Sequence, residues 1–195
     1  MQTNAEHETG DLWVFGYGSL MWRPGFDFKE RVSARLIGLH RALCVFSFVH
    51  RGTPERPGLV LGLDRGGMCR GVAYLVAAAK RLETIAYLRE REQVTSVYLE
   101  TLRQIELEDA GRRRVRALCY IVDRSHVQYA GRLTTAESLH LIRQGRGSSG
   151  ANPDYVVETV RALEALGYRE GELHRLAAHL KGGHETGHET DIGSA

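Results

Sequence analysis

Residues 12–20 have the sequence LWVFGYGSL, in which a short apolar run is followed at once by a glycine-rich turn. Four successive apolar residues, 12–15, are typical of a strand that is buried on both faces. Gly16 and Gly18 then predict a tight turn. Such a turn can offer backbone N–H groups to an anion or oxyanion, but the same residues also suit a plain hairpin turn. Both interpretations of the turn remain open.

The turn does not match a nucleotide-binding loop. A dinucleotide fingerprint needs a third glycine and a helix behind it, and here Pro24 interrupts any helix. A phosphate-binding P-loop needs Gly-Lys-Ser/Thr, which is absent. The sequence also lacks a GxSxG nucleophile elbow, and its HExxH match, HETGH at residues 184–188, lies in the polar tail and outside any predicted helix. We therefore expect no nucleotide, no metal and no other cofactor.

Most of the predicted strands lie in the first two thirds of the chain. A polar stretch, Asp64-Arg65-Gly66-Gly67, predicts a turn between two of them, and the arginines at 112–114 predict a solvated hairpin turn within residues 108–114. Beyond the first strand, the predicted strands cover residues 30–48 (two strands), 59–63, 70–76, 94–107 and 115–122.

Helical patterns follow the strands. One helix is predicted over residues 78–93, and Thr134 and Glu137 have the spacing of a capping box that begins a second. Two more are predicted over residues 153–166 and 170–180. Strands come first and helices last, without strict alternation, so the sequence predicts an α+β fold. The expected architecture is a small mixed or closed β-barrel with flanking helices.

The length and composition suit one compact domain. The chain has 195 residues, of which 43% are hydrophobic and 26% charged, and its formal net charge is only +2. We expect a flexible N-terminus over residues 1–10, a domain over 11–181 and a disordered tail over 182–195. That tail repeats HET, and His184 and His188 could contact a metal adventitiously. With no secretory or membrane-spanning pattern visible, a soluble cytoplasmic monomer is expected.

The cysteines argue against both a disulfide framework and a zinc site. There are three, an odd number, and no two form a CxxC pair. Cys44 and Cys119 lie in apolar runs, and we expect both to be buried free thiols. Cys69 is flanked by polar residues, which would allow it to be exposed.

One carboxylate occupies an unusual helical position. Glu92 follows Ile85 by seven residues and Leu88 by four, so it lies on the apolar stripe of the predicted helix together with Leu82 and Ala86. A carboxylate on a buried face has a raised pKa and a chemical role, or else it pairs with an arginine near the helix end. The pattern alone does not choose between them.

The segment HRGTPERPG, residues 50–58, predicts a rigid loop because it contains two prolines between strands. Arg51 in this loop could bind a substrate carboxylate through its guanidinium. An ordered surface loop without a binding role is the other interpretation.

Together these segments resemble the ChaC family of γ-glutamylcyclotransferases. Five pieces in order are hard to reach by chance, and the resemblance covers residues 12–180. The matching pieces are FGYGSLMW (15–22), HRGTPERPG (50–58), GVAY (71–74), Tyr87-Leu88 with Arg91-Glu92, and SGANPDY (149–155). In one place the chain departs from the family, since only His40-Arg41 represents an arginine-rich stretch.

The resemblance implies a cofactor-independent enzyme that cleaves glutathione to 5-oxoproline and Cys-Gly. In this reaction the α-amine of the substrate attacks its own γ-carbonyl. The family pattern implies that Glu92 is the catalytic acid/base and that the following residues bind substrate: Tyr17, Gly18, Ser19, Leu20, Arg51, Tyr98 and Tyr155.

Three other functions stay open at this stage. The substrate could be another γ-glutamyl amine or dipeptide, although the loop at 50–58 resembles the glutathione-specific branch. The chain could bind such a metabolite without turning it over. An RNA-associated role would rest on the arginines at 112–114, but the small net charge makes a nucleic-acid partner unexpected. A membrane partner is also not expected.

Overall fold

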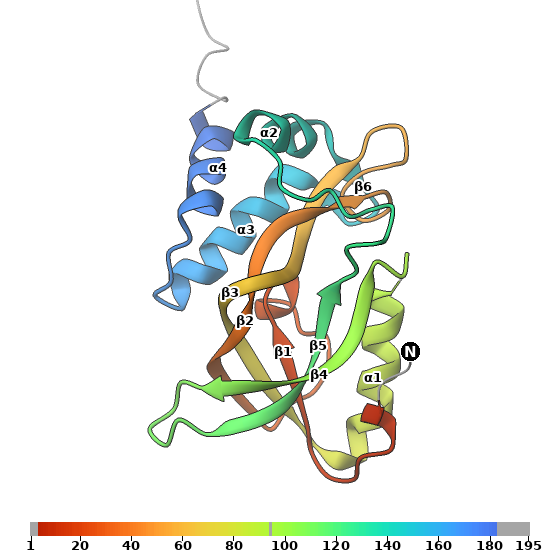
Figure 1. Cartoon of the computed structure of the whole chain (residues 1–195), viewed down its shortest axis with the longest axis vertical. Helices are drawn as coiled ribbons and strands as arrows, with labels where there is room; N and C mark the ends of the chain where they lie inside the picture. The colour runs from red at the N-terminus through yellow and green to blue at the C-terminus, as the bar shows by residue number, and fades with distance from the viewer. Residues whose placement is uncertain (1–3, 94, 183–195) are drawn as a thin grey trace, which may run out of the picture.

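The computed structural model describes residues 4–93 and 95–182. Within them, five strands form a closed barrel in the order β1-β3-β2-β4-β5 (Figure 1). β1 runs parallel to β5 and antiparallel to β3, so the barrel is mixed, as predicted. The strand bounds are Leu12–Gly16 (β1), Glu30–Ser47 (β2), Gly58–Val76 (β3), Tyr98–Leu107 (β4) and Arg114–Val122 (β5).

The longest strands correct two details of the sequence prediction. β2 and β3 are single strands of 18 and 19 residues, where the sequence predicted two strands each. The turn predicted at Asp64–Gly67 is wrong, because the ladder continues past it with a register shift between Ile37 and Leu39. Gly66 and Gly67 adopt positive φ angles of 97° and 67°. A β-bulge uses glycine in this conformation as readily as a turn does, so the residues alone could not distinguish them.

The predicted helices are all present. Three of them, α2, α3 and α4, pack together at one end of the barrel, and α1 lies on another side (Figure 1). The capping box of Thr134 and Glu137 begins α2. The helices are α1 (Arg81–Glu92), α2 (Thr135–Gln144), α3 (Asn152–Ala165) and α4 (Gly171–Gly182). The described chain also has the short 3-10 turns η1 (Asn4–Glu6), η2 (Ser19–Met21) and η3 (Ala78–Lys80), and a two-stranded sheet of β6 (Arg146–Gly147) and β7 (Gly150–Ala151).

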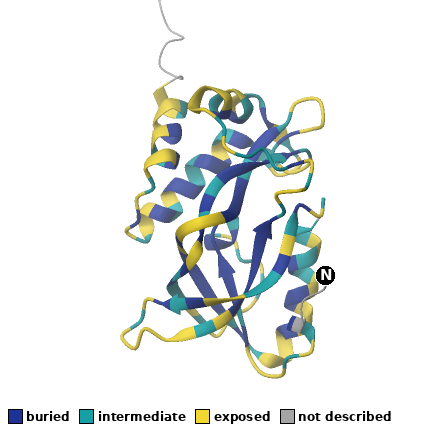
Figure 2. Ribbon diagram, in the orientation of Figure 1, coloured by how far each residue is buried: buried dark blue, intermediate teal, exposed yellow. Residues whose placement is uncertain are grey.

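The buried face of α1 differs in part from the predicted stripe. Ile85 and Leu88 are buried, as expected, and pack with Leu20 in one core cluster (Figure 2). Leu82, however, is 63% exposed, because the inner face continues through Thr84 instead. Glu92 keeps its inward position because it is four residues from Leu88.

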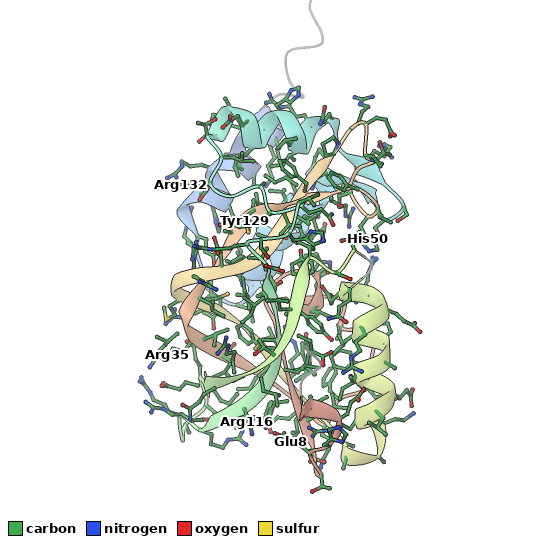
Figure 3. The ribbon with its side chains drawn as sticks, turned by 45° about the vertical axis from the view of Figure 1, so that its right-hand side comes forward. Glu8, Arg35, His50, Arg116, Tyr129 and Arg132 are labelled. Atoms are coloured by element: carbon green, nitrogen blue, oxygen red, sulfur yellow. The ribbon has the colours of Figure 1, made fainter. Side chains whose placement is uncertain are left out.

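Residues 4–10 pack against the barrel and α1. The Arg81 guanidinium donates to the Ala5 carbonyl at 2.7 and 2.9 Å, and Ala5 is fully buried. Glu8 pairs with Arg116 of β5 at 2.8 Å, and the two side chains lie together in Figure 3. The sequence predicted a loose segment here, whereas the structure gives these residues contacts; the flexibility itself stays a prediction.

The predicted tail lies almost wholly outside the described residues. α4 ends at Gly182, and the segment 183–195 with His184 and His188 follows it. Its disorder and the domain boundary at residue 181 therefore stay predictions. Within the described ranges, no helix has both the length and the apolar content needed to span a membrane.

All three cysteines are buried and free. This confirms the prediction for Cys44 and Cys119, and it shows that Cys69, which its polar neighbours would have allowed to be exposed, is buried as well. Cys69 is 0% exposed because side chains alternate along β3. Its polar neighbour Arg70 points outward, so the thiol points into the barrel interior.

Native thiols should react slowly with Ellman's reagent at pH 8. Burial raises the pKa of Cys44 to about 12 and that of Cys69 to about 11. Only the thiolate is nucleophilic, so a pKa of about 11 lowers the reactive fraction roughly 200-fold relative to an ordinary thiol of pKa about 8.5. Protein unfolded in guanidinium provides the control, and all three of its thiols should react with the reagent at once. Fast labelling of any native thiol would contradict its burial.

Candidate active site

The glycine-rich segment after β1 forms a single 3-10 turn, η2, and not a hairpin. The Met21 N–H donates to the Gly18 carbonyl at 2.9 Å, and β1 pairs with β3 and β5, neither of which follows it directly. Glycine at position 18 leaves room for a close neighbour. A Cβ there would stand 3.3 Å from the Tyr155 hydroxyl. The N–H groups that open such a turn have no acceptor within it, so they are available to a ligand.

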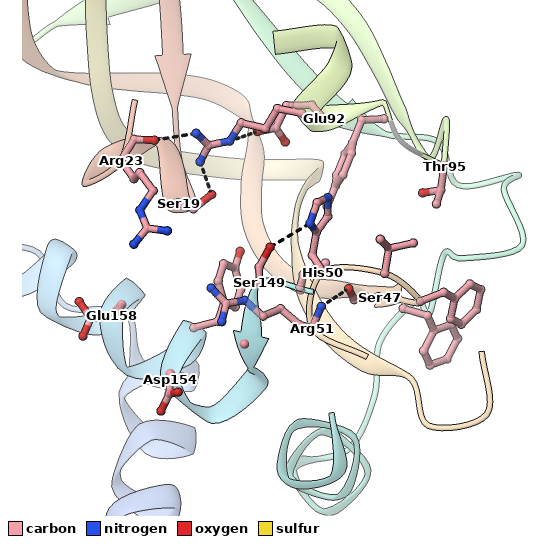
Figure 4. A pocket seen from close by; sticks show the side chains of 18 of the residues that line it. Ser19, Arg23, Ser47, His50, Arg51, Glu92, Thr95, Ser149, Asp154 and Glu158 are labelled. Carbon is pink, nitrogen blue, oxygen red and sulfur yellow. Dashed lines mark hydrogen bonds and ion pairs between the residues drawn. The ribbon is translucent and has the colours of Figure 1, made fainter. Parts of the chain in front are cut away.

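A cavity of about 670 Å³ lies beside this turn. Its walls come from η2, the C-terminal end of α1, the segment after β2 and the start of α3 (Figure 4). Five of the residues singled out from the sequence line it: Ser19, Arg51, Glu92, Tyr98 and Tyr155. They come from separate elements, so the barrel brings together residues up to 136 positions apart.

The other three residues singled out from the sequence do not form the wall. Tyr17 is buried, and its pKa is raised by burial first and then by Tyr98 and Glu92. The Leu20 side chain belongs to the core cluster on the α1 side. Gly18 and Leu20 can therefore contribute only their backbone.

Glu92 is the last residue of α1, and its side chain is 18% exposed. Burial raises the pKa of its carboxyl group. The neighbouring guanidinium of Arg91 opposes this rise, with its Nε 3.3 Å from Oε1 of Glu92. Glu92 thus pairs with an arginine, as one of the two interpretations expected, and it also lines the cavity; its chemical role stays a prediction.

The two cavity tyrosines share one backbone partner. The Tyr98 hydroxyl donates to the Leu61 carbonyl at 2.7 Å, and the Leu61 N–H donates to the Tyr155 hydroxyl at 3.3 Å. Because Tyr155 accepts in this bond, its own O–H can still donate into the cavity. Burial raises the pKa of Tyr155, so the hydroxyl stays protonated at neutral pH.

The loop after β2 is held by short contacts. Arg51 donates to the Ala151 carbonyl at 3.0 Å, and its guanidinium lies 5.4 Å from the centre of the Tyr155 ring. His50 bonds Ser149 at 3.0 Å. A Cβ on Gly52 would stand 2.1 Å from a backbone nitrogen. The loop is therefore ordered, and Arg51 is partly engaged by the protein itself.

Sequence reasoning missed several residues of the wall. Trp22 and Arg23 directly follow the glycine turn, and this adjacency was the available signal. Asp154 and Glu158 stand one helical turn apart on α3, and Phe46 and Phe48 stack at 6.4 Å. The wall therefore carries both cationic and anionic groups beside aromatic rings. Such a lining suits a small ligand that has an ammonium and carboxylates. Among the described residues, no cluster of His, Cys, Asp or Glu could hold a metal ion.

The arginines at 112–114 each have an acidic neighbour. Arg112 and Arg113 lie in the predicted hairpin turn between β4 and β5, and Arg114 is the first residue of β5. Arg113 pairs with Glu30 at 2.6 Å and with Asp109 at 2.5 Å. Arg112 and Arg114 each lie 3.8 Å from Glu106.

Comparisons with known proteins agree on one family. The family model described as ChaC-like protein matches residues 12–182. A glutathione-specific γ-glutamylcyclotransferase of Escherichia coli strain K12 is 35% identical over 174 residues, which is 89% of this chain and 74% of that protein. Glutathione-specific γ-glutamylcyclotransferase 1 of Danio rerio is 34% identical over 148 residues, 75% of this chain and 76% of that protein.

A solved structure shares the fold. The crystal structure of a yeast γ-glutamylcyclotransferase specific to glutathione superposes with a TM-score of 0.82 at 23% identity, covering 89% of this chain and 97% of that one. Its identity is low enough that it supports the architecture alone.

Proposed function

The chain belongs to the ChaC-like protein family, and we propose that it is a γ-glutamylcyclotransferase that cleaves glutathione to 5-oxoproline and Cys-Gly. The names of the relatives from E. coli and zebrafish support the substrate. The observation that carries the proposal is the largely buried Glu92 carboxylate, which faces a cavity beside the glycine turn. A site that only bound the metabolite would have no need of a base there.

Glu92 is proposed to move the proton that the reaction requires. The substrate α-amine starts as an ammonium, which is not nucleophilic, so a base must take one proton. The amine nitrogen then bonds to the γ-carbonyl carbon, and the bond from that carbon to the cysteine nitrogen breaks. The leaving amine receives that proton from Glu92, and the ring nitrogen gives its second surplus proton to the freed carboxylate, which passes it to the departing amine or to solvent. A single carboxylate that acts first as base and then as acid contributes typically about 10²–10⁴-fold, and its raised pKa suits this dual use.

The cavity wall is proposed to hold the γ-glutamyl group in its folded, reactive shape. Ring closure within one molecule has an effective molarity of about 10⁵–10⁸ M when the geometry is fixed. The aromatic rings of Trp22 and Tyr155, 6.3 Å apart, offer apolar walls. Arg51 is proposed to bind a substrate carboxylate.

The glycine turn is proposed to stabilise the tetrahedral oxyanion. The N–H groups of Ser19 and Leu20 open η2, and the Tyr155 hydroxyl lies next to Gly18. Donors already in place cost no reorganisation when charge develops, and one such donor is worth about 3 kcal/mol. Tyr98 lines the cavity and Tyr17 is buried in the core, and both are proposed to shape the γ-glutamyl pocket.

We expect the purified chain to release 5-oxoproline from glutathione in buffer that contains EDTA. γ-Glu-Ala, tested at equal concentration, is the comparison substrate, because it shares the γ-glutamyl group and lacks the glycine and the thiol. A much higher kcat/KM for glutathione supports the proposal. Equal or faster turnover of γ-Glu-Ala would reassign the substrate to other γ-glutamyl compounds. Calorimetric binding of glutathione without any 5-oxoproline would show a binding protein and overturn the enzymatic proposal.

A further inference from the structure

We infer that Arg91 is a positioning residue, which holds the Glu92 carboxylate and the glycine turn in a fixed relation to each other. This inference rests on the proposed function, because it assigns Arg91 a part in the same reaction. Arg91 is not itself required to touch the substrate. Its role comes from what its guanidinium connects.

The guanidinium of Arg91 joins the end of α1 to the chain that follows β1. It donates to the Ser19 hydroxyl at 2.8 Å, to the Arg23 carbonyl at 2.7 Å and to the Tyr87 hydroxyl at 2.8 Å. Its Nε faces Glu92 at 3.3 Å. In Figure 4 the dashed lines at Ser19, Arg23 and Glu92 are these bonds. Its side chain is only 18% exposed, so water competes little for its donors.

A second arginine on the same helix shows that this arrangement is specific. Arg89 has the same side chain two residues earlier, about 200° around the helix axis. Its guanidinium makes two bonds of 2.8 Å to Glu100 and also pairs with Glu6. It therefore ties α1 to β4 and to the N-terminal segment, away from the cavity. Only one of the two arginines connects the proposed base to the turn.

The chemistry of these contacts requires a guanidinium. Its planar fork can donate in several fixed directions at once, whereas an ammonium acts as a compact point charge on a flexible stem. Lysine at position 91 could keep the charge near Glu92 but could not reach the Ser19 hydroxyl and the Arg23 carbonyl together. A displacement of about 1 Å between reacting groups can cost about 10²-fold in rate. Loss of the fork should therefore lower kcat even where the charge remains.

Among the described residues, Arg91 carries the positive charge that opposes the effect of burial on the pKa of Glu92, although Arg23, His50 and Arg51 line the same cavity. Four tyrosine hydroxyls have pKa values raised by burial first and by Glu92 among the further causes: Tyr17 after β1, Tyr98 on β4, Tyr120 on β5 and Tyr155 on α3. They are neutral at pH 7 and cannot replace a cation. Without Arg91, the Glu92 pKa should rise further.

Two substitutions at this position separate geometry from charge. Arg91→Gln removes both the fork and the charge, and Arg91→Lys removes mainly the fork. For Arg91→Gln we expect kcat on glutathione to fall about 10²-fold, and the acid limb of the kcat/KM profile to move to higher pH. For Arg91→Lys we expect a similar fall in kcat with the acid limb near its wild-type position. KM should change less than kcat in both variants.

Arg89→Gln is the matched control, because it removes an equally well-bonded arginine from the same helix. It should lower the melting temperature and leave the pH profile unchanged. The inference is overturned if Arg91→Gln keeps both the wild-type kcat and the wild-type acid limb of the kcat/KM profile. It is also overturned if Arg89→Gln shifts that acid limb as far as Arg91→Gln does.

Direct titration of Glu92 keeps this test separate from the proposed function. Carbon-13 NMR of the Glu92 carboxyl group follows its protonation without any turnover. A higher Glu92 pKa in Arg91→Gln than in wild type is the expected result, and an unchanged pKa overturns the electrostatic part. Wild-type protein that releases no 5-oxoproline would remove the proposed function while this titration still decides whether Arg91 controls Glu92.

Discussion

Replacing Glu92 with glutamine should reduce kcat for 5-oxoproline release from glutathione by about 10²–10⁴-fold, the usual contribution of one general acid/base. The amide has nearly the same shape as the carboxylate and can occupy the same place beside Arg91, whose Nε lies 3.3 Å from Oε1 of Glu92. It cannot take a proton from the substrate ammonium. KM should change little, because substrate contacts remain. A coupled assay for 5-oxoproline under saturating glutathione measures the loss.

Glu90→Gln is the control for this experiment. Glu90 lies on the same helix two residues earlier, but it is exposed and does not line the cavity. Its replacement should leave kcat within a factor of about two, as surface substitutions usually do little. A folded Glu92→Gln protein with wild-type kcat would show that another group moves the proton, and the mechanism would then be wrong.

The stability of the Glu92 variant should depend on pH in a defined direction. Burial raises the Glu92 pKa in the folded state, so folding favours the protonated form. The wild type therefore loses stability as the pH rises through the folded pKa. Glutamine is neutral throughout, so Glu92→Gln should melt at or above the wild-type temperature at pH 7. That advantage should shrink as the pH falls, and thermal melts at several pH values will show whether it does.

Replacing Asn152 with alanine should cost the largest share of folding stability among the substitutions discussed. Its fully buried amide accepts from the Leu59 N–H at 2.6 Å and donates to the Leu59 carbonyl at 2.9 Å. Alanine would leave both backbone groups buried without these partners. Each unsatisfied group costs about 1–3 kcal/mol, so we expect a loss of about 2–6 kcal/mol. A typical total stability is only about 5–15 kcal/mol.

Urea denaturation of the full chain gives this free energy of unfolding, and Thr159→Val is the matched control. Thr159 is also fully buried on α3, but its hydroxyl bonds only the Tyr155 carbonyl four residues earlier at 2.8 Å. That carbonyl keeps its helical partner, so valine should cost no more than about 1 kcal/mol. If both variants lose equally little, the paired bonds from Asn152 do not hold α3 to β3.

Much of the fold could be predicted because its signals are local. The apolar runs of β1 and β5, the capping box at Thr134 and the order of strands before helices led to a mixed barrel with flanking helices. The errors occurred where one local pattern fits two structures. Gly66 and Gly67 suit a turn or a bulge equally, and the polar neighbours of Cys69 face the opposite side of the same strand.

The candidate site could be predicted only in part. Glu92 was identified through its spacing from Ile85 and Leu88, and both of these are buried. Leu82 on the predicted stripe is exposed, so the inward position of Glu92 was predicted from a face that was only partly right. Arg91 and Asn152 carried no recognisable signal of their own roles. Their partners, Ser19 and Leu59, lie 72 and 93 positions away in the chain.

The sequence by itself determined the order of strands before helices, the capping box that begins α2, the presence of a turn at the glycines after β1 and the family, because each depends on the order of neighbouring residues and on their intrinsic conformations. Only the tertiary structure decided which side chains meet. The rotation of α1 about its own axis is set by how Ile85 and Leu88 pack against the barrel. That packing sends Arg89 to Glu100 and Arg91 to the turn, although the two residues are identical in chemistry. Contacts over such distances arise from burial of apolar surface by the whole chain, and no short stretch of sequence contains that information.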